Sequence, residues 1–133
     1  MIVDTSAIVA ILRGESDSSA MAAALVVGGD KVSLSAGSWI ELAAVITRSG
    51  QHHLWADAED LIETAPISIA PVTIEQAEIA REAYRRYGLG TGHPAKLNFG
   101  DCFAYALAKA TGEPLLFKGA DFAHTDVARA LPA

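Results

Sequence analysis

The chain of 133 residues is 51% hydrophobic and 20% charged, which excludes a disordered protein and predicts one folded domain over residues 1–133. Its net charge of −6 argues against general nucleic-acid binding, and a single cysteine, Cys102, excludes an internal disulfide and a cysteine-based zinc cluster. With no basic leader and no apolar run of the ~20 residues that cross a bilayer, the chain is expected to be cytoplasmic.

Apolar runs of strand length alternate with helical patterns along the chain, and this alternation is typical of a parallel α/β sheet. Short buried strands are predicted at residues 2–4, 32–35, 67–71, 115–118 and, with a weaker pattern, 128–131. Helices are predicted at residues 6–13, 18–27, 38–48, 54–64, 74–87 and 99–111. Residues 73–76 form a predicted capping box, and the glycine-rich loop at residues 88–94 is either a lid over a substrate or a plain connection.

The first predicted strand ends in an acid, Asp4, within the stretch IVDTSAIVA, whose other residues are mostly apolar or β-branched. A buried carboxylate is costly unless it is paired, hydrogen-bonded or bound to a metal. The sequence therefore predicts a compensating partner for Asp4 elsewhere in the chain.

Glu41 is the first candidate, because it lies in the stretch SWIELAAVI among apolar neighbours. A helix that is apolar nearly all round is buried, so Glu41 is not expected to be simply solvated. Two interpretations are equally supported by the spacing. Glu41 either lies in a site, or forms a capping box in which it bonds back to the amide of Ser38.

Asp101 and Asp121 are further candidates. Asp101 opens the helix in LNFGDCFAYALAKA, where an acid is favoured by the helix dipole, and Gly100 before it permits close approach of a ligand to the backbone. Asp121 follows the strand LLFKG, at a position where turn chemistry alone often selects Asp; Asp126 is a weaker candidate for the same reason. Each acid thus has an ordinary structural interpretation beside the functional one.

These acids share a place in the predicted fold. Asp4, Asp101 and Asp121 fall at strand ends or helix starts, and Glu41 closely follows the second strand, where open α/β sheets build their sites. Gathered carboxylates repel one another unless a cation neutralises them, and oxygen ligands without His or Cys select Mg²⁺ or Mn²⁺. The sequence therefore predicts a divalent-cation site, which suits the attack of water on a phosphodiester.

Positive charge is concentrated in residues 81–118, where six bases and three acids give +3, whereas the remainder carries four bases and thirteen acids, or −9. This segment is a candidate for holding nucleic-acid phosphates beside the acids. The candidate contacts are Arg81, Arg85, Arg86 and Lys96. The alternative is that they are solvated surface charges or dimer contacts.

The chain resembles the PIN-domain ribonucleases, and within them the VapC toxins of bacterial VapBC toxin–antitoxin pairs. The resemblance runs nearly end to end and is carried by four stretches: IVDTSAIVAIL, WIELAAVI, LNFGDCFAYALAKATGEPLLFKGADF and HTDV. It implies an α/β/α sandwich with a short central parallel sheet, and an acidic Mg²⁺ or Mn²⁺ site that hydrolyses RNA, such as a tRNA or a ribosomal RNA.

The resemblance also assigns roles to residues and implies partners. The metal-binding and catalytic acids are Asp4, Glu41, Asp101 and the less constant Asp121. The supporting hydroxyl residues are Thr5, Ser6 and Thr125. VapC-like proteins usually form homodimers, assemble into heterotetramers or larger complexes with a small VapB antitoxin, and receive its basic tail in the acidic groove.

Two other function classes compete with a ribonuclease. A binding module with an inactive site, which would act only with its antitoxin on operator DNA or RNA, is disfavoured by the intact set of acids. A phosphatase of the aspartyl-phosphate type needs a second Asp two residues after the first, and VDTSA lacks it.

Overall fold

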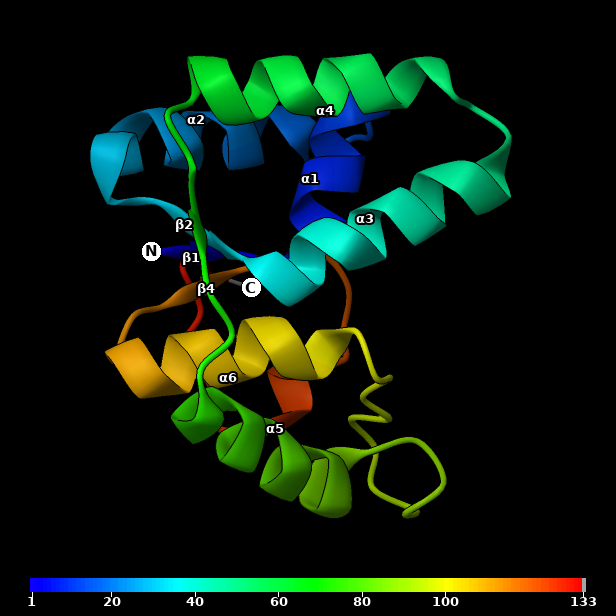
Figure 1. Ribbon diagram of the computed structural model, residues 1–133, viewed down its shortest axis with the longest axis vertical. Coiled ribbons are helices and arrows are strands. Elements are labelled where there is room, and N and C mark those ends of the chain that lie inside the picture. Colours follow the sequence, from blue (N-terminus) through cyan, green and yellow to red (C-terminus); the bar gives the residue numbers. More distant parts are fainter. Residues whose placement is uncertain (133) are drawn as a thin grey trace.

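A parallel sheet runs through the centre of the protein, whose computed structural model describes residues 1–132 (Figure 1). Its strands lie in the order β3-β2-β1-β4, and every pairing between them is parallel. The strands are β1 (Ile2–Val3), β2 (Ser33–Ser35), β3 (Ser68–Ala70) and β4 (Leu115–Leu116). Ile2 pairs with Ser33 on one side and with Leu115 on the other, so β1 is a central strand.

Helices cover both faces of this sheet, with α1 to α4 on one face and α5 and α6 on the other (Figure 1). Their bounds are α1 (Thr5–Leu12), α2 (Ser18–Gly28), α3 (Ala36–Ser49), α4 (His53–Thr64), α5 (Ile74–Tyr87) and α6 (Asp101–Thr111). Short 3-10 turns lie at Gly29–Lys31 and Phe122–His124. The predicted three-layer α/β/α sandwich is therefore confirmed.

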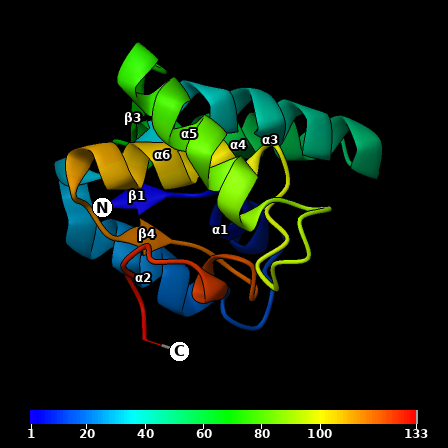
Figure 2. The same ribbon diagram turned by 90° about the horizontal axis from the view of Figure 1, so that it is seen from below.

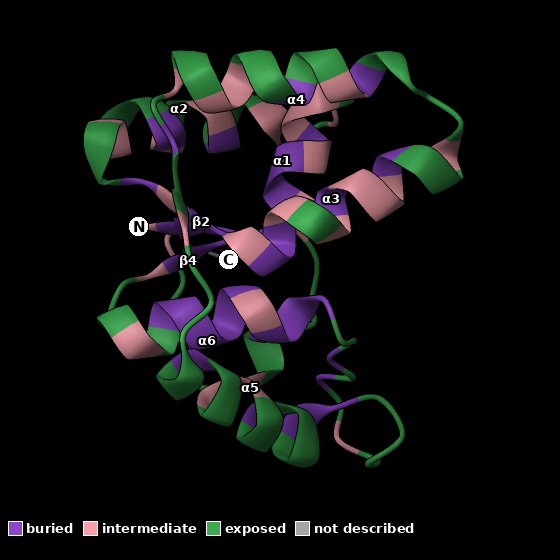
Figure 3. Cartoon of the chain, viewed as in Figure 1, coloured by how far each residue is buried: buried purple, intermediate pink, exposed green. Residues whose placement is uncertain are grey.

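The two-residue strands are buried on both faces, which explains their apolar sequences. Ile2 and Leu115 point into the core formed with α5 and α6, whereas Val3 and Leu116 point into the core formed with α1 to α4. Figure 3 shows the result: β1, β4 and most of α6 are buried, and the outer sides of α4 and α5 are exposed. The edge strand β3 is not buried as the sequence predicts, because Ser68 and Ile69 are exposed. The buried strands β1 and β4 thus hold in place the start of α1, which follows β1, and the segment that follows β4, and both of these carry acids.

Several predicted boundaries shift by one or two residues. Helix α3 begins at Ala36, because Ser35 at the end of β2 caps it directly, and α6 begins at Asp101, two residues later than expected. The predicted strand at 128–131 is reduced to one bridge between Leu115 and Arg129. Of the predicted capping box at residues 73–76, the Thr73 half is confirmed, since its hydroxyl accepts a hydrogen bond from the Gln76 amide (3.1 Å).

The loop between α5 and α6 extends beyond the ends of both helices (Figures 1 and 2). It is anchored where the Leu97 amide donates to the Tyr87 carbonyl (3.0 Å) and the Leu89 amide donates to the Leu97 carbonyl (2.9 Å). Leu97 and Ala95 are fully buried. The loop is therefore a packed connection with an exposed tip.

None of the helices within residues 1–132 combines the length and apolar character that a bilayer crossing requires.

Candidate active site

Asp4 directly follows β1 and caps the N-terminus of α1. Its side chain is buried, and Oδ2 accepts hydrogen bonds from the Ser6 amide (2.9 Å) and the Ser6 hydroxyl (2.6 Å). The other oxygen, Oδ1, is buried with no hydrogen-bond partner in the described part of the chain. A buried carboxylate oxygen in this state is costly, so Ser6 meets only half of the requirement that the sequence predicts for Asp4.

The two hydroxyl residues after Asp4 fix the first turn of α1 from different sides. Ser6 Oγ also accepts a hydrogen bond from the Lys118 amide (3.0 Å), which joins this turn to the residues after β4. Thr5 Oγ1 donates to the Ser38 carbonyl (3.1 Å) and joins the turn to α3. Ser6 supports Asp4 by contact, whereas Thr5 supports it through the backbone.

The capping-box interpretation of Glu41 is wrong. The N-cap of α3 is Ser35, whose hydroxyl accepts a hydrogen bond from the Gly37 amide (3.2 Å), and Ser38 lies inside the helix. The stretch around Glu41 is also less buried than its composition predicts, since Ile40 is 72% exposed. Glu41 is half-buried, and its carboxylate is left available for a role outside helix capping.

Glu41 reaches across to the start of α6 because Gly100 has no side chain. A Cβ at Gly100 would lie 1.3 Å from Glu41 Oε2 and 2.2 Å from Glu41 Cδ. The carboxylate therefore occupies the space that any other residue would fill. The sequence suggested that Gly100 permits the approach of a ligand, and in the structure it permits the approach of Glu41.

Asp101 is the first residue of α6 and is buried. Its Oδ2 accepts a hydrogen bond from the Asn98 amide (2.9 Å), while Asn98 Oδ1 accepts one from the Asp101 amide (2.9 Å). This reciprocal exchange fixes the side chain at the helix start, in the manner of a capping box. Asn98 is not among the predicted site residues, although an Asn three residues before an acid at a helix start is a signal that the sequence contains.

Asp121 lies after β4 and precedes the short turn Phe122–His124, with no capping hydrogen bond from its side chain. It is exposed, unlike Asp4 and Asp101. The Thr125 hydroxyl donates to the Phe122 carbonyl (2.7 Å) and so closes this turn. Thr125 is therefore placed to hold the backbone after Asp121, and no contact of its own with another acid is seen within residues 1–132.

The four predicted acids lie around one open pocket of about 330 Å³. They come from four different segments, which the parallel sheet brings together at the carboxyl ends of its strands. The residues that line the pocket are Asp4, Thr5, Ser6, Val9, Glu15, Glu41, Val45, Asn98, Asp101, Lys118, Asp121 and Phe122. We call this pocket the acid pocket.

Burial and mutual repulsion shift the titration of the two deepest acids. Burial raises the pKa of Asp4 to about 6, against hydrogen bonds from Ser6 and the Thr5 backbone that lower it, and the charge of Glu41 adds to the rise. Burial also raises the pKa of Asp101 to about 7, opposed by a backbone hydrogen bond, with the charges of Asp4, Glu41 and Asp121 adding to it. The acids thus act on one another as one electrostatic cluster.

The donor set fits a hard divalent cation. Carboxylate oxygens are the ligands that Mg²⁺ and Mn²⁺ prefer, and the unpartnered Oδ1 of Asp4 is an available donor. Within residues 1–132 no three such groups already stand in the arrangement of a metal site. Coordination would therefore require movement of the more exposed side chains, Glu41 and Asp121.

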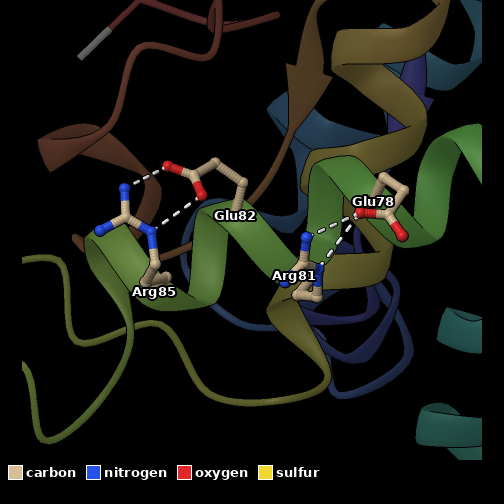
Figure 4. Close-up of polar contacts among 4 residues, drawn as sticks. All are labelled: Glu78, Arg81, Glu82 and Arg85. Atoms are coloured by element: carbon tan, nitrogen blue, oxygen red, sulfur yellow. Dashed lines mark hydrogen bonds and ion pairs between the residues drawn. The ribbon is translucent and has the colours of Figure 1, made fainter.

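The predicted phosphate contacts lie outside the acid pocket. On the exposed face of α5, Arg81 pairs with Glu78 (3.0 Å), and Arg85 forms two hydrogen bonds with Glu82 (Figure 4). The charge count of +3 begins at residue 81 and therefore leaves out the acid that pairs with Arg81. The structure thus partly neutralises this segment.

Two further bases complete that predicted set. The Arg86 guanidinium lies 4.8 Å from the centre of the Tyr87 ring, and Lys96 is exposed in the loop with a positive φ of 48°. Contact of these four bases with RNA stays a prediction.

Comparison with known proteins identifies the family. The PIN-domain model matches residues 1–128. The chain belongs to the PIN-domain family. Among relatives in Mycobacterium tuberculosis, ribonuclease VapC28 is 52% identical over 98% of both chains. Ribonuclease VapC42 is 46% identical over 96% of both chains, and ribonuclease VapC30 is 46% identical over 99% of this PIN-domain chain and all of its own.

A solved structure agrees with the fold of this PIN domain. VapC20 of Mycobacterium tuberculosis, described as a toxin that cleaves the sarcin–ricin loop, superposes with a TM-score of 0.75 over 95% of both chains. Its sequence is 18% identical, so this likeness concerns the fold alone. The predicted PIN-like fold is thereby confirmed by a second line of comparison.

Asp4→Asn should change how stability depends on pH in the absence of divalent cations. The native pKa of Asp4, about 6, exceeds its ordinary value of 3.8, so the native state holds the proton to higher pH and the free energy of unfolding falls as pH rises between these values. Asn cannot ionise. We expect the advantage of the variant over the unmodified protein to grow by about 2 kcal/mol between about pH 4.5 and about pH 8. Urea unfolding with a chelator measures this, and an equal difference at both pH values would contradict it.

Gly100→Ala should displace the Glu41 carboxylate without unfolding the protein. The φ and ψ of Gly100 are −64° and −38°, which suit Ala, and the atom in conflict is the end of a flexible side chain. We expect stability within about 1 kcal/mol of the unmodified protein and weaker Mn²⁺ binding by calorimetry. In a Glu41→Ala background the same change should have no further effect on Mn²⁺ affinity; an additive loss would show that Gly100 acts otherwise.

Proposed function

We propose that this protein is a metal-dependent endoribonuclease toxin of a type II toxin–antitoxin pair. The observation that carries the proposal is the acid pocket, in which Asp4, Glu41, Asp101 and Asp121 converge. It stands in a chain of the PIN family whose relatives at 46–52% identity are named VapC ribonucleases. The raised pKa values of Asp4 and Asp101 support it, because such shifts gather at functional sites.

Each acid has a role that follows from its surroundings. Ser6 holds Asp4 so that Oδ1 stays free for a cation, and Asn98 holds Asp101 in a fixed orientation beside it. Glu41 reaches the same place over Gly100. Asp121, which is exposed, orients a water or contributes to a second cation.

The proposed cofactor is Mg²⁺, with Mn²⁺ as a substitute. When bound, such an ion lowers the pKa of water and stabilises charge on a phosphodiester. The carboxylates of this chain would hold the ion, orient the attacking water and accept its proton. The bond between phosphorus and the leaving ribose oxygen then breaks, and that oxygen takes up a proton.

The substrate is proposed to be a structured RNA, either a tRNA or a ribosomal RNA. The relatives at 46–52% identity are named ribonucleases, which supports RNA as the substrate. Such a substrate places the activity in the cytoplasm. The bases at Arg81, Arg85, Arg86 and Lys96 are proposed to approach RNA phosphates only after leaving their present contacts.

Partners are proposed from charge and exposed apolar area. An antitoxin of the VapB type would place a basic tail in the acid pocket, where opposite charge favours it. A homodimer, which would form a heterotetramer or larger assembly with antitoxin, would cover an exposed apolar surface. This surface lies around Phe99 and Phe103, which line two neighbouring apolar pockets, and Phe99 is 74% exposed.

Asp101→Asn and Glu41→Gln should each abolish RNA cleavage and toxicity on induced expression, while the fold survives. Each change removes one charge from the electrostatic cluster and leaves a side chain of the same shape, so loss of activity cannot be assigned to lost packing. End mapping by RNA sequencing after induction measures cleavage. An active purified Asp101→Asn protein would reject the assignment.

Asp57→Asn provides the matched control, because Asp57 is an exposed acid on α4 outside the acid pocket. It removes the same charge and should leave cleavage unchanged. If the unmodified protein bound RNA or operator DNA with its antitoxin but never cleaved RNA, the binding-module function would replace this one.

A further inference from the structure

A lysine, Lys118, lines the acid pocket. Its ammonium group pairs with Glu15 Oε2 (2.8 Å) and with Asp17 Oδ1 (3.1 Å), both from the turn between α1 and α2. Among the lining residues, all of which the structure describes, Lys118 is the only one with a positive charge, against five carboxylates. Neither of its ion-pair partners belongs to the electrostatic cluster proposed to hold the cation.

The backbone of Lys118 is fixed relative to Asp4, whereas its side chain is not. The Lys118 amide donates to Ser6 Oγ (3.0 Å), and Ser6 Oγ donates to Asp4 Oδ2 (2.6 Å). The side chain is 35% exposed, and its ion pairs hold the pKa of Lys118 above the ordinary value. The Lys118 backbone is therefore held beside Asp4 through Ser6, and the charged ammonium group can move on four rotatable bonds.

A pocket lined by carboxylates repels the phosphates of RNA, and a bound divalent cation offsets only part of that charge. A substrate phosphate therefore needs a second cation at the pocket wall. Partly exposed ion pairs such as those of Lys118 contribute little to stability. Exchanging them for a charge-assisted hydrogen bond to phosphate therefore costs little free energy.

We propose that Lys118 binds a phosphate of the RNA substrate in the acid pocket, leaving Glu15 and Asp17, which hold it ready in the free protein. This assignment rests on the proposed ribonuclease function. It makes Lys118 a substrate-binding residue and makes Glu15 and Asp17 its resting partners. Because the contact is to phosphate, it positions the RNA backbone without reading sequence.

The test measures RNA affinity in the Asp101→Asn background, where the probe is not cleaved. A fluorescently labelled RNA hairpin is titrated with the full chain over a salt series, using anisotropy. We expect Lys118→Met to weaken binding about tenfold and to reduce the salt slope by roughly 0.7 to 0.9, whereas Lys118→Arg keeps both. The double variant Glu15→Gln with Asp17→Asn frees the lysine and should bind RNA at least as tightly as the parent.

Lys109→Met is the matched control, since Lys109 has similar exposure (38%) and an ion pair with Asp126 (3.2 Å) but lies outside the acid pocket. If it weakens RNA binding as much as Lys118→Met does, the effect is one of net charge and the proposal is overturned. Equal losses in Lys118→Met and in the double variant would overturn it in favour of a purely structural ion pair. Unchanged RNA binding in Lys118→Met would overturn the assignment of Lys118 and leave the ribonuclease function standing. If the Asp101→Asn parent bound no RNA, the ribonuclease function would be overturned as well.

Discussion

The buried carboxylate of Asp4 is the constraint on which the rest of the site depends. Asp4 directly follows the central strand β1, where its amide donates to the Leu116 carbonyl (2.9 Å), and only one of its two carboxylate oxygens is satisfied within the described chain. Such a group raises the free energy of the folded protein unless charge or a hydrogen bond compensates it. This unsatisfied oxygen is the feature on which the proposed role of Asp4 as a cation ligand rests.

Several interactions that look structural serve to keep this group in place. Ser6 connects Asp4 to the Lys118 amide, so the turns after β1 and β4 are held together by one hydroxyl. On the other side of the acid pocket, Gly100 lets Glu41 reach the start of α6, where Asn98 fixes Asp101. The acids therefore come from distant segments but are oriented by short-range contacts.

The architecture was readable from the sequence because its signals are local and repeated. Alternating apolar runs and helical patterns predicted every helix and the four sheet strands, and the cap at Thr73 was predicted with its partner. The cap of α3 was misplaced because Ser35 and Ser38 both suit an N-cap, and only the end of β2 decides between them. The acids were predicted as a group, since strand ends of a parallel sheet meet at one edge.

Other features depend on tertiary contacts or on the limits of a sequence window. The charge of the segment at 81–118 was overrated because Glu78 lies just before it and pairs with Arg81. The approach of Glu41 to Gly100 and the pairing of Lys118 with Glu15 join residues far apart in the chain, and no local pattern encodes them. Sequence thus predicted which acids gather, and the structure adds how they are held.

Thermal unfolding with increasing Mn²⁺ tests the central claim most directly, because a ligand that binds only the folded state raises its stability. The account predicts that Mn²⁺ raises the unfolding temperature of the unmodified protein and of Asp57→Asn. It also predicts that Asp4→Asn, already more stable at about pH 8 without metal, shows no such rise. An equal rise in Asp4→Asn, or none in the unmodified protein, would contradict it.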